Sequence, residues 1–291
     1  MESLTVLILT GNEEKNIGKC LTSIAPLEAK VHIVDSMSED RTVEIAESMG
    51  AVVHKRPWST YAEQFNWGLD NTAIDTPWVM RMDADEEITP ALAGAIQDFL
   101  RDPPDDVAGV YVRRRVYFMG RWIRHGGYYP TWLLRLFRNG QGRCESLLMD
   151  EHIVVEGGGT IQLHEDIIDK NNKDLTFWTD KHNKYASREV MDILNKQSSA
   201  SDAEAHGERV QAKAIGRQDA ARRWVKDNIY LRTPLFVRPF LYFSYRYFLR
   251  LGFLDGTRGL IFHFLQAFWY RFLVDAKLYE YRLQQKSRQD T

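Results

Sequence analysis

The first hundred residues alternate short apolar runs with segments of helical periodicity, and this alternation constrains the fold more than any other feature. Strands are predicted at residues 4–10, 31–35, 51–54 and 78–82, and helices at residues 16–24, 42–49, 61–73 and 89–101. Short, continuously apolar strands are typical of a parallel sheet that is buried on both faces. We therefore expect an α/β fold, with a mostly parallel central sheet, right-handed crossovers and helices on both faces.

The pattern changes after residue 108, where the predicted strands become shorter and mixed with polar residues. Strands are predicted at residues 110–117, 132–138 and 153–155, and we expect them to add antiparallel strands to the sheet. Three further segments follow: a helix at residues 174–195, a polar link at 196–207 and a basic helix at 208–231.

Polar side chains stand at the ends of three predicted strands. Thr10, Asn12 and Glu13 follow the first strand, Asp35 ends the second, and Asp83 and Asp85 follow the apolar run that begins at Trp78. Ligands in open α/β sheets bind beyond the carboxyl ends of such strands. Two carboxylates at that edge suit Mg²⁺ or Mn²⁺, which in turn holds a diphosphate. Taken alone, the Asp-x-Asp sequence is better explained by an acidic loop than by a metal site.

Two familiar phosphate-binding motifs are missing from the sequence. No Gly-x-Gly-x-x-Gly follows the first strand, so a nicotinamide dinucleotide site is not expected, and no Gly-x-x-x-x-Gly-Lys-Ser/Thr occurs, which excludes a P-loop.

Charge is distributed unevenly along the chain. Residues 1–108 carry 8 Lys and Arg against 20 Asp and Glu, whereas residues 208–291 carry 16 against 7. An acidic first part suits a metal-using site, and a basic last part suits an anionic surface. Cys20 and Cys144 form neither a disulfide framework nor a zinc pattern, so we expect a reducing cytoplasm. We expect no signal peptide, because the apolar run at residues 4–9 is too short.

The last part of the chain is rich in Phe, Tyr, Leu and Trp. There are two such stretches, residues 234–254 and 259–283, and five arginines are interspersed in or between them: Arg238, Arg246, Arg250, Arg258 and Arg271. Neither stretch has the roughly 18 charge-free residues of a transmembrane helix. The pattern predicts helices that lie in a membrane interface, with arginines near lipid phosphates. The alternative is a pair of ordinary amphipathic helices packed on a core.

Several motifs together give the chain a family resemblance. Four of them are Ile8-Leu-Thr10-Gly-Asn12-Glu13-Glu14, Val34-Asp35-Ser36-Met-Ser38, Gln64-Phe-Asn66-Trp-Gly68 and Asp83-Ala-Asp85-Glu86. With these motifs the chain resembles the family 2 glycosyltransferases, which have the GT-A fold. The bacterial lipopolysaccharide-core and surface-glycan enzymes are the nearest in likeness, because the sequence also contains Trp132-Leu-Leu-Arg135-Leu-Phe-Arg138 and Gly252-Phe-Leu-Asp255-Gly. The resemblance extends over nearly the whole chain.

The resemblance implies a role for each matching residue. Thr10, Asn12 and Glu13 would line the nucleotide pocket, Asp35 would bind the base, Gln64 and Asn66 would lie near the ribose or diphosphate, Asp83 would contact the ribose or sugar, and Asp85 would bind the metal with Asp83 as second candidate. Many relatives have an arginine just before the asparagine, where this chain has Gln64-Phe-Asn66, and this puts one diphosphate contact in doubt. The alternatives are a helix N-cap for Asp35 and a helix-surface amide for Asn66.

An inverting sugar transfer also needs a base that deprotonates the acceptor hydroxyl. The resemblance makes Glu151 the first candidate and Asp150 the second, although relatives often have His-Glu where this chain has Asp-Glu. An acidic turn before the strand at residues 153–155 is the alternative.

Two further groups have open assignments. His164 is a candidate metal or diphosphate ligand or else a structural residue. A basic patch is a candidate site for a phosphorylated acceptor or else a solvated hairpin, and it comprises Arg113, Arg114, Arg115, Arg121, Arg124 and His125.

The sequence therefore predicts a GT-A, Rossmann-like sandwich with C-terminal amphipathic helices. Residues 1–107 would form the nucleotide-sugar half, 108–207 the acceptor half and 208–291 a membrane-associating region. The expected activity is metal-dependent, inverting transfer of a hexose from a nucleotide-sugar, such as a UDP-sugar, to a lipid-linked or lipopolysaccharide-type acceptor. We expect it at the inner face of a bacterial inner membrane, bound through residues 234–283, with no nucleic-acid partner. The alternatives are a sugar-nucleotide pyrophosphorylase and an inactive, membrane-bound interaction protein on the same scaffold.

Overall fold

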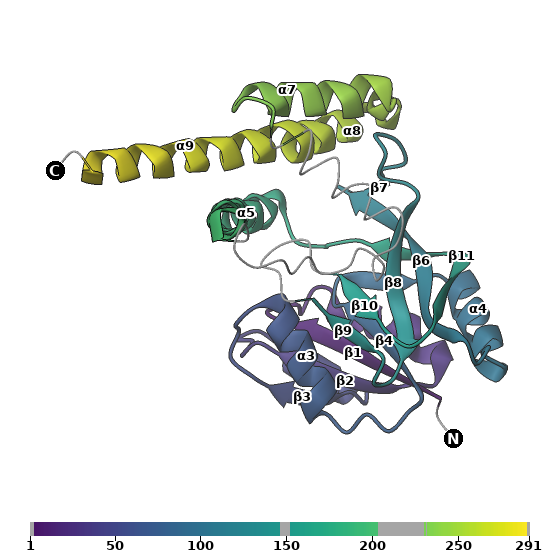
Figure 1. Ribbon diagram of the computed structural model, residues 1–291. Helices are drawn as coiled ribbons and strands as arrows, with labels where there is room; N and C mark the ends of the chain where they lie inside the picture. Colours follow the sequence, from purple (N-terminus) through teal and green to yellow (C-terminus); the bar gives the residue numbers. More distant parts are fainter. Residues whose placement is uncertain (1–2, 146–151, 203–229, 231, 290–291) are drawn as a thin grey trace. The chain divides into compact units, whose positions relative to one another are not determined.

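The computed structural model describes residues 3–145, 152–202, 230 and 232–289, with the backbone alone for residues 196–202 (Figure 1). The chain forms two compact units. Within the described part, unit 1 contains residues 3–122, 128–145 and 152–172, and unit 2 contains residues 123–127, 173–202, 230 and 232–289. The chain therefore enters unit 2 briefly at residues 123–127 before it returns to unit 1.

Unit 1 is built on one large, mostly parallel sheet. Its strands lie in the order β3 (Val52–Lys55), β2 (Lys30–Asp35), β1 (Leu4–Thr10), β4 (Trp78–Asp83), β8 (Thr131–Arg138), β6 (Val107–Phe118), β11 (Gly159–Asp169) and β5 (Glu86–Ile88). Neighbours from β3 to β4 are parallel, β8 is antiparallel to both β4 and β6, and β11 is parallel to β6. The carboxyl ends of β1, β2, β4, β6 and β11 consequently meet at one edge.

Helices cover both faces of this sheet, so the predicted α/β sandwich is confirmed. They are α1 (Ile17–Ile24), α2 (Thr42–Ser48), α3 (Tyr61–Asn71) and α4 (Pro90–Arg101), with a short 3₁₀ turn η1 (Ala25–Leu27). One core contains Ile8, Met80 and Ile96 and lies under α1 and α4, whereas the other contains Leu7 and Phe65 and lies under α3. Alternation of side chains along each strand produces the two separate cores.

Three predictions about the middle of the chain were wrong. The strand β11, with 11 residues, was not predicted at all, and β6, which was expected to be short, has 12 residues. Residues 153–155 form β10 (Ile153–Val155), which pairs with β9 (Gly142–Cys144) in a separate hairpin instead of joining the large sheet. A further short strand, β7 (Arg121–Trp122), pairs with the end of β6.

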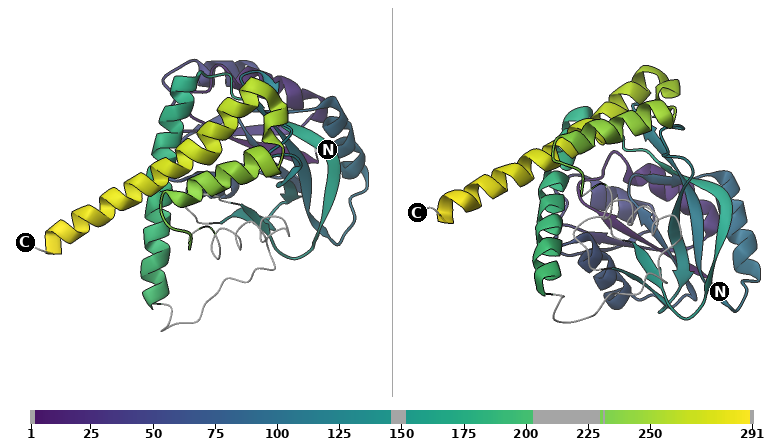
Figure 2. Two further views of the ribbon diagram at one scale, coloured as in Figure 1. Left: turned by 90° about the horizontal axis from the view of Figure 1, so that it is seen from above. Right: turned by 45° about the horizontal axis from the view of Figure 1, so that its top comes forward.

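Unit 2 is helical. It contains α5 (Leu175–Asp202), α7 (Val237–Ser244), a π-helical turn η4 (Tyr245–Leu249), a 3₁₀ turn η5 (Gly252–Asp255), α8 (Gly256–His263), a second π-helical turn η6 (Phe264–Trp269) and α9 (Tyr270–Gln289). Ala186, Val190 and Ile193 of α5 pack against Tyr270, Val274 and Leu278 of α9. In both orientations of Figure 2, α7 runs beside the continuous helical rod that ends in α9, and the Arg238 guanidinium forms a buried ion pair with Asp275 of that rod.

The tail differs from the prediction in two places. Helix α5 continues through Asp202, so residues 196–202 are helical and do not form a link. These seven residues contain no proline or glycine that would end the helix. The first aromatic stretch is broken at Leu251, whose φ of 58° ends its helix. The predicted basic helix at residues 208–231 falls almost wholly outside the described residues. Throughout the described part of the chain, every helix is too short or too polar to cross a bilayer.

Candidate functional site

The polar strand ends predicted to converge do lie together at one edge of the sheet. Thr10 is the register partner of Asp35, and Leu9 is the partner of Asp83. The hydroxyl of Thr10 donates a hydrogen bond of 2.7 Å to Oδ1 of Asp35. The carboxyl ends of β1, β2 and β4 therefore present their side chains as one group, as Figure 1 shows for the strands themselves.

Asp35 braces the turn that follows β2. Its side chain is fully buried, and its two oxygens accept hydrogen bonds from the Thr10 hydroxyl and from the amide and hydroxyl of Ser38, at 2.7 and 2.5 Å for the latter two. These donors occupy both carboxylate oxygens. Its contact with a nucleotide base stays a prediction, and it would require one of these bonds to be exchanged.

Asn12 and Glu13 hold the loop after β1 against that same turn. Asn12 has a left-handed backbone with φ of 55°, and its Oδ1 accepts a bond of 2.8 Å from the amide of Glu39. Glu13 Oε2 accepts a bond of 2.6 Å from the side chain of Asn16. The loop is thus pre-shaped by its own polar groups, and its role in lining a nucleotide pocket stays a prediction.

The two predicted helix residues are engaged elsewhere. The Gln64 amide donates to the Arg56 carbonyl at 3.1 Å and accepts from the Arg56 guanidinium at 2.7 Å. Asn66 exchanges two hydrogen bonds with the Cys144 backbone, at 2.8 and 2.9 Å, and so ties α3 to β9. This geometry does not support the predicted contact of Asn66 with a ribose or diphosphate, and it is also not that of a free surface amide.

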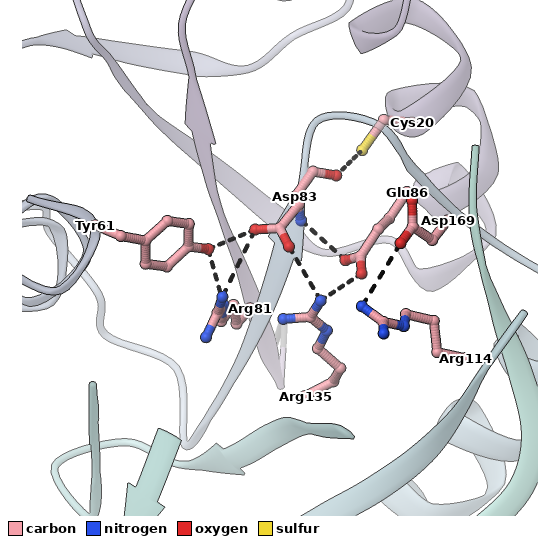
Figure 3. Close-up of polar contacts among 8 residues, drawn as sticks. All are labelled: Cys20, Tyr61, Arg81, Asp83, Glu86, Arg114, Arg135 and Asp169. Carbon is pink, nitrogen blue, oxygen red and sulfur yellow. Dashed lines mark hydrogen bonds and ion pairs between the residues drawn. The ribbon is translucent and has the colours of Figure 1, made fainter. Parts of the chain in front are cut away.

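Asp83 lies in a network of cations and a tyrosine (Figure 3). The Tyr61 hydroxyl donates to its Oδ1, and the Arg135 guanidinium lies 3.1 Å from its Oδ2. Arg81 adds a guanidinium nitrogen at 3.9 Å from Oδ1 and stacks over the Tyr61 ring. The negative charge of Asp83 is therefore already balanced by the protein.

Glu86 and Arg135 form a buried ion pair beside Asp83. Both side chains are at most 5% exposed, and Glu86 also accepts a bond of 3.0 Å from the Asp83 amide. Burial raises the pKa of Glu86 above its ordinary value, and the Arg135 guanidinium opposes that rise. For Arg135, burial acts to lower the pKa, but Glu86 and Asp83 more than offset it and keep the guanidinium charged. This pair fixes the turn that carries Asp85.

Asp85 has a different environment from Asp83. Its Oδ2 accepts a hydrogen bond of 2.8 Å from the Asn171 amide, and its carbonyl accepts one of 2.9 Å from the Lys170 amide. Among the residues that the structure describes, Asp85 forms no ion pair with Lys, Arg or His. Its carboxylate thus retains its charge for an added cation, which fits the predicted division of roles between the two aspartates.

This donor set suits a metal that the substrate helps to bind. No three His, Cys, Asp or Glu side chains converge into a complete metal cage within the described ranges. Mg²⁺ is commonly held by one or two carboxylates together with substrate phosphates and water. Asp85, with the amide oxygen of Asn171 next to it, is sufficient for a site of this kind.

The candidate bases, Glu151 and Asp150, lie outside the described residues. The residues that flank them are paired: the His152 amide donates to Glu145 Oε1 at 3.0 Å, and the Glu145 amide donates to the His152 carbonyl at 3.0 Å. The two ends of this segment therefore meet at the top of the β9–β10 hairpin, which Asn66 ties to α3. Their role as bases stays a prediction.

Comparison with known proteins decides the family. Residues 5–157 match the family model described as "Glycosyl transferase family 2". The chain belongs to glycosyl transferase family 2. Among curated relatives, it is 34% identical over 165 residues to the lipopolysaccharide core biosynthesis glycosyltransferase LpsC of Rhizobium meliloti, a match that covers 53% of this chain and 58% of LpsC. It is also 36% identical over 97 residues to an uncharacterized glycosyltransferase of Rickettsia felis, covering 33% of this chain and 34% of that protein. The matches thus span from a third to rather more than half of these relatives.

A solved structure supports the fold over the whole chain. The mannosyltransferase PcManGT from Pyrobaculum calidifontis, in complex with GDP-Man and Mn²⁺, matches 95% of this chain and 86% of its own, with 13% identity and a TM-score of 0.51. At this identity the likeness shows the fold alone. The predicted GT-A architecture of this family 2 member is consistent with it.

The other sequence candidates are separated by the structure. His164 lies inside β11 rather than at its end, with its ring edge-on to Trp132 at 5.3 Å. The basic patch is divided among different partners: Arg114 faces Asp169 at 3.6 Å, Arg113 and Arg115 face Asp166, and His125 pairs with Asp255 at 2.8 Å within unit 2.

Several residues around the two aspartates were not predicted from the sequence: Tyr61, Arg81, Glu86 and Arg135 beside Asp83, and Asn171 beside Asp85. Arg135 carried the clearest signal, because an arginine inside the apolar strand Thr131–Arg138 needs an acidic partner when it is buried.

Proposed function

We propose that this chain is a glycosyltransferase that moves a sugar from a nucleotide-sugar donor with the help of Mg²⁺ or Mn²⁺. The carrying observation is the contrast between the two aspartates: Asp83 is neutralised by Arg135 and Arg81, whereas Asp85 keeps an available carboxylate beside it. Membership of glycosyl transferase family 2 supports the reaction type.

The residues would divide the work as follows. Asp85 would hold the metal, with Asp83 as a second, weaker ligand that also contacts the ribose or sugar. The metal, when bound, would stabilise the negative charge that develops on the leaving diphosphate. Glu151, or Asp150 in second place, would accept the proton of the acceptor hydroxyl as that oxygen attacks the anomeric carbon. A single displacement of this kind inverts the configuration at that carbon.

For the donor we propose a UDP-sugar, on the family resemblance, with a GDP-sugar as alternative because the fold relative PcManGT holds GDP-Man and Mn²⁺. For the acceptor we propose a lipid-linked or lipopolysaccharide-type glycan, which the similarity to LpsC, a lipopolysaccharide core biosynthesis glycosyltransferase, supports. A sugar-nucleotide pyrophosphorylase is disfavoured because the loop after β1 is acidic, with Glu13 and Glu14 in place of a basic phosphate loop.

The decisive experiment is calorimetric titration of the full chain with UDP and with GDP, with and without Mn²⁺. We expect metal-dependent heat for one nucleotide, and its loss in Asp85→Asn with unchanged thermal stability. Asp98→Asn is the matched control, because Asp98 is an exposed aspartate on α4 that pairs with Arg101. Absence of metal-dependent binding in the wild-type chain would leave the inactive interaction protein as the better hypothesis.

We propose further that unit 2 attaches the enzyme to the inner face of the bacterial inner membrane. Large apolar side chains are exposed on η4, η5 and the helices beside them, including Phe240, Leu241, Phe248, Leu249, Leu251 and Leu254. Leu249 is 75% exposed and Phe248 57% exposed, and Arg250 and Arg258 are exposed on the same segment. An exposed apolar patch with adjacent arginines suits an anionic lipid surface.

Co-sedimentation with vesicles of phosphatidylglycerol and phosphatidylcholine tests this attachment. We expect Leu249→Glu to reduce binding several-fold, since it places a charge in the centre of the patch. Val52→Glu on β3 is the control, because Val52 is an equally apolar, 52% exposed residue of unit 1. Equal binding of both variants and the wild type would show that the patch is not the membrane-binding surface.

A further inference from the structure

Two arginines of β6 share one buried carboxylate. Arg115 donates to Asp166 Oδ2, and the Nε of Arg113 lies 3.3 Å from Asp166 Oδ1. The Tyr129 hydroxyl donates a second hydrogen bond, of 2.9 Å, to Oδ1. The Asp166 side chain is 3% exposed, whereas those of Arg113 and Arg115 are 26% and 31% exposed. Two hydrogen-bond donors and the Arg113 guanidinium therefore surround the carboxylate, while both guanidiniums still reach solvent.

Aromatic rings hold the two guanidiniums in fixed planes. Arg115 lies over the Trp122 ring at 4.6 Å, and Arg113 lies over the Tyr129 ring at 5.6 Å. The two rings meet edge-to-face with centroids 5.0 Å apart. Such stacking orients a guanidinium without using its N–H donors. Each arginine consequently keeps donors for a further acceptor.

The group carries excess positive charge. Two guanidiniums face one carboxylate, and the Nε of Arg115 is buried without a hydrogen-bond acceptor among the residues that the structure describes. A forked guanidinium matches a phosphate or carboxylate in geometry, and a charged hydrogen bond is stronger than a neutral one. The remaining charge and donors are complementary to one added anion.

The arginine pair lies on the same face of the sheet as Asp83. Along β6, Arg113 and Arg115 follow Tyr111 at two-residue steps, and Tyr111 belongs to the core under α3. Asp83 points to that face too, since it contacts Tyr61 of α3. β6 and β4 are separated by β8 alone, so the pair lies roughly 10 Å along the sheet from the Asp83 strand, or two strand spacings. Arg114 points to the opposite face and pairs with Asp169.

We propose that Arg113 and Arg115, oriented by Asp166, Trp122 and Tyr129, form a binding site for an anionic group of the acceptor. The site takes a sugar that carries a phosphate or a carboxylate, with the Trp122 and Tyr129 rings beside the sugar. This inference rests on the proposed glycosyltransferase function, because it names the acceptor class for that reaction. Asp166 is a positioning residue here and not a base, because it is buried between two guanidiniums and accepts hydrogen bonds from Arg115 and Tyr129.

The test measures binding of three simple probes to the full chain by calorimetry or ligand-observed NMR. The probes are glucose 6-phosphate, glucuronate and glucose, added after UDP and Mn²⁺ have saturated the donor pocket. We expect one or both anions to bind and uncharged glucose not to bind, and the better of the two anions identifies phosphate or carboxylate as the acceptor group.

Arg115→Gln should weaken binding of that anion by about tenfold or more, as the loss of a charged hydrogen bond predicts. It leaves Arg113 and Tyr129 on Asp166, so the fold should survive. Arg101→Gln is the matched control: it removes the same charge from another arginine–aspartate pair, 2.7 Å apart and fully on the surface of α4, and should change the affinity by less than twofold.

Each outcome has a clear meaning. Equal binding of glucose and the anions, absence of anion binding in the wild-type chain, or an equal effect of the two variants would overturn the site. Loss of UDP–Mn²⁺ binding together with anion binding in Arg115→Gln would also overturn it, since the variant would then act on the whole fold. If the wild-type chain binds no nucleotide but Arg115→Gln still abolishes anion binding, the anion site stands and the proposed transferase function fails.

Discussion

Arg135→Met tests the buried network that supports the Asp85 turn. The substitution keeps a long apolar side chain in β8 but leaves Glu86, which is 2% exposed, and Asp83 without their guanidinium. Breaking a buried ion pair by removing one partner costs about 3–5 kcal/mol of the free energy of unfolding. The free energy of unfolding of a whole domain is only about 5–15 kcal/mol. With a urea m-value of about 2 kcal/mol/M, the unfolding midpoint should fall by about 2 M.

The pH dependence of this deficit follows from Glu86. Because burial raises its pKa, the folded chain binds that proton more tightly than the unfolded chain does. The contribution favours folding at low pH and is lost as the pH rises through the folded-state pKa. Removal of Arg135 raises that pKa further, so the deficit of the variant should be smaller at pH 5 than at pH 8. Adding Glu86→Gln should recover part of the lost stability.

Urea unfolding followed by circular dichroism measures these quantities. Arg138→Met is the control on the same strand, because the Arg138 guanidinium donates to the carbonyls of Val107 and Pro104 and not to a carboxylate. A deficit below about 1 kcal/mol for Arg135→Met, or one that is equal at pH 5 and pH 8, would refute the reasoning.

Three more predictions concern single side chains. Asn66→Ala should lower the free energy of unfolding by about 1–3 kcal/mol, since it removes both hydrogen bonds to the Cys144 backbone. Calorimetry should find a UDP affinity within twofold of that of the wild-type chain. Unchanged stability with a large loss of UDP affinity would instead support a contact of Asn66 with the nucleotide-sugar. Burial lowers the pKa of His182 to about 4, so the free energy of unfolding should fall by roughly 3 kcal/mol as the pH falls from 6.5 to 4. Urea unfolding of His182→Phe should show a smaller decrease over this pH range. A decrease equal to that of the wild-type chain would contradict this prediction. Gly259→Ala should lower the melting temperature, because an added Cβ would lie 2.4 Å from the Asp255 Cβ, whereas Gly94→Ala on α4 meets nothing within 4 Å and should raise it; equal shifts would refute the packing argument.

The parallel half of the sheet could be predicted from the sequence because each of its strands has a recognisable local pattern of apolar residues. The strands β1, β2 and β4 are mainly apolar, as is typical of buried parallel strands. β11 was missed because its alternation of Ile161, Leu163 and Ile167 is interrupted by charged residues. Two of them, Asp166 and Asp169, pair with arginines of β6, and a local sequence pattern does not reveal such partners.

The candidate site was predicted as a set of strand ends but not as a network. The neighbourhood of Asp83 and Asp35 follows from parallel topology alone. The difference between Asp83 and Asp85 depends on Arg135, 52 residues further along the chain, and on Asn171, 86 residues further along. The exchange between Asn66 and Cys144 spans 78 residues. Contacts at such separations leave no periodic trace in the sequence.

Residues 123–127 belong to unit 2 although the segments on both sides belong to unit 1, and this limits how the chain can be truncated or combined with related chains. The amide and ring of His125 are both bound by Asp255, and the Gly126 amide donates to the Arg250 carbonyl at 2.8 Å. A truncation before Asp255 would strip this loop of its partners, so the loss of membrane binding after such a deletion could not be assigned to the missing aromatic surface. Chimeras with related transferases face the same constraint, since a foreign tail must bring an aspartate that matches His125. In a chimera, the tail and the loop between β7 and β8 should therefore be exchanged together.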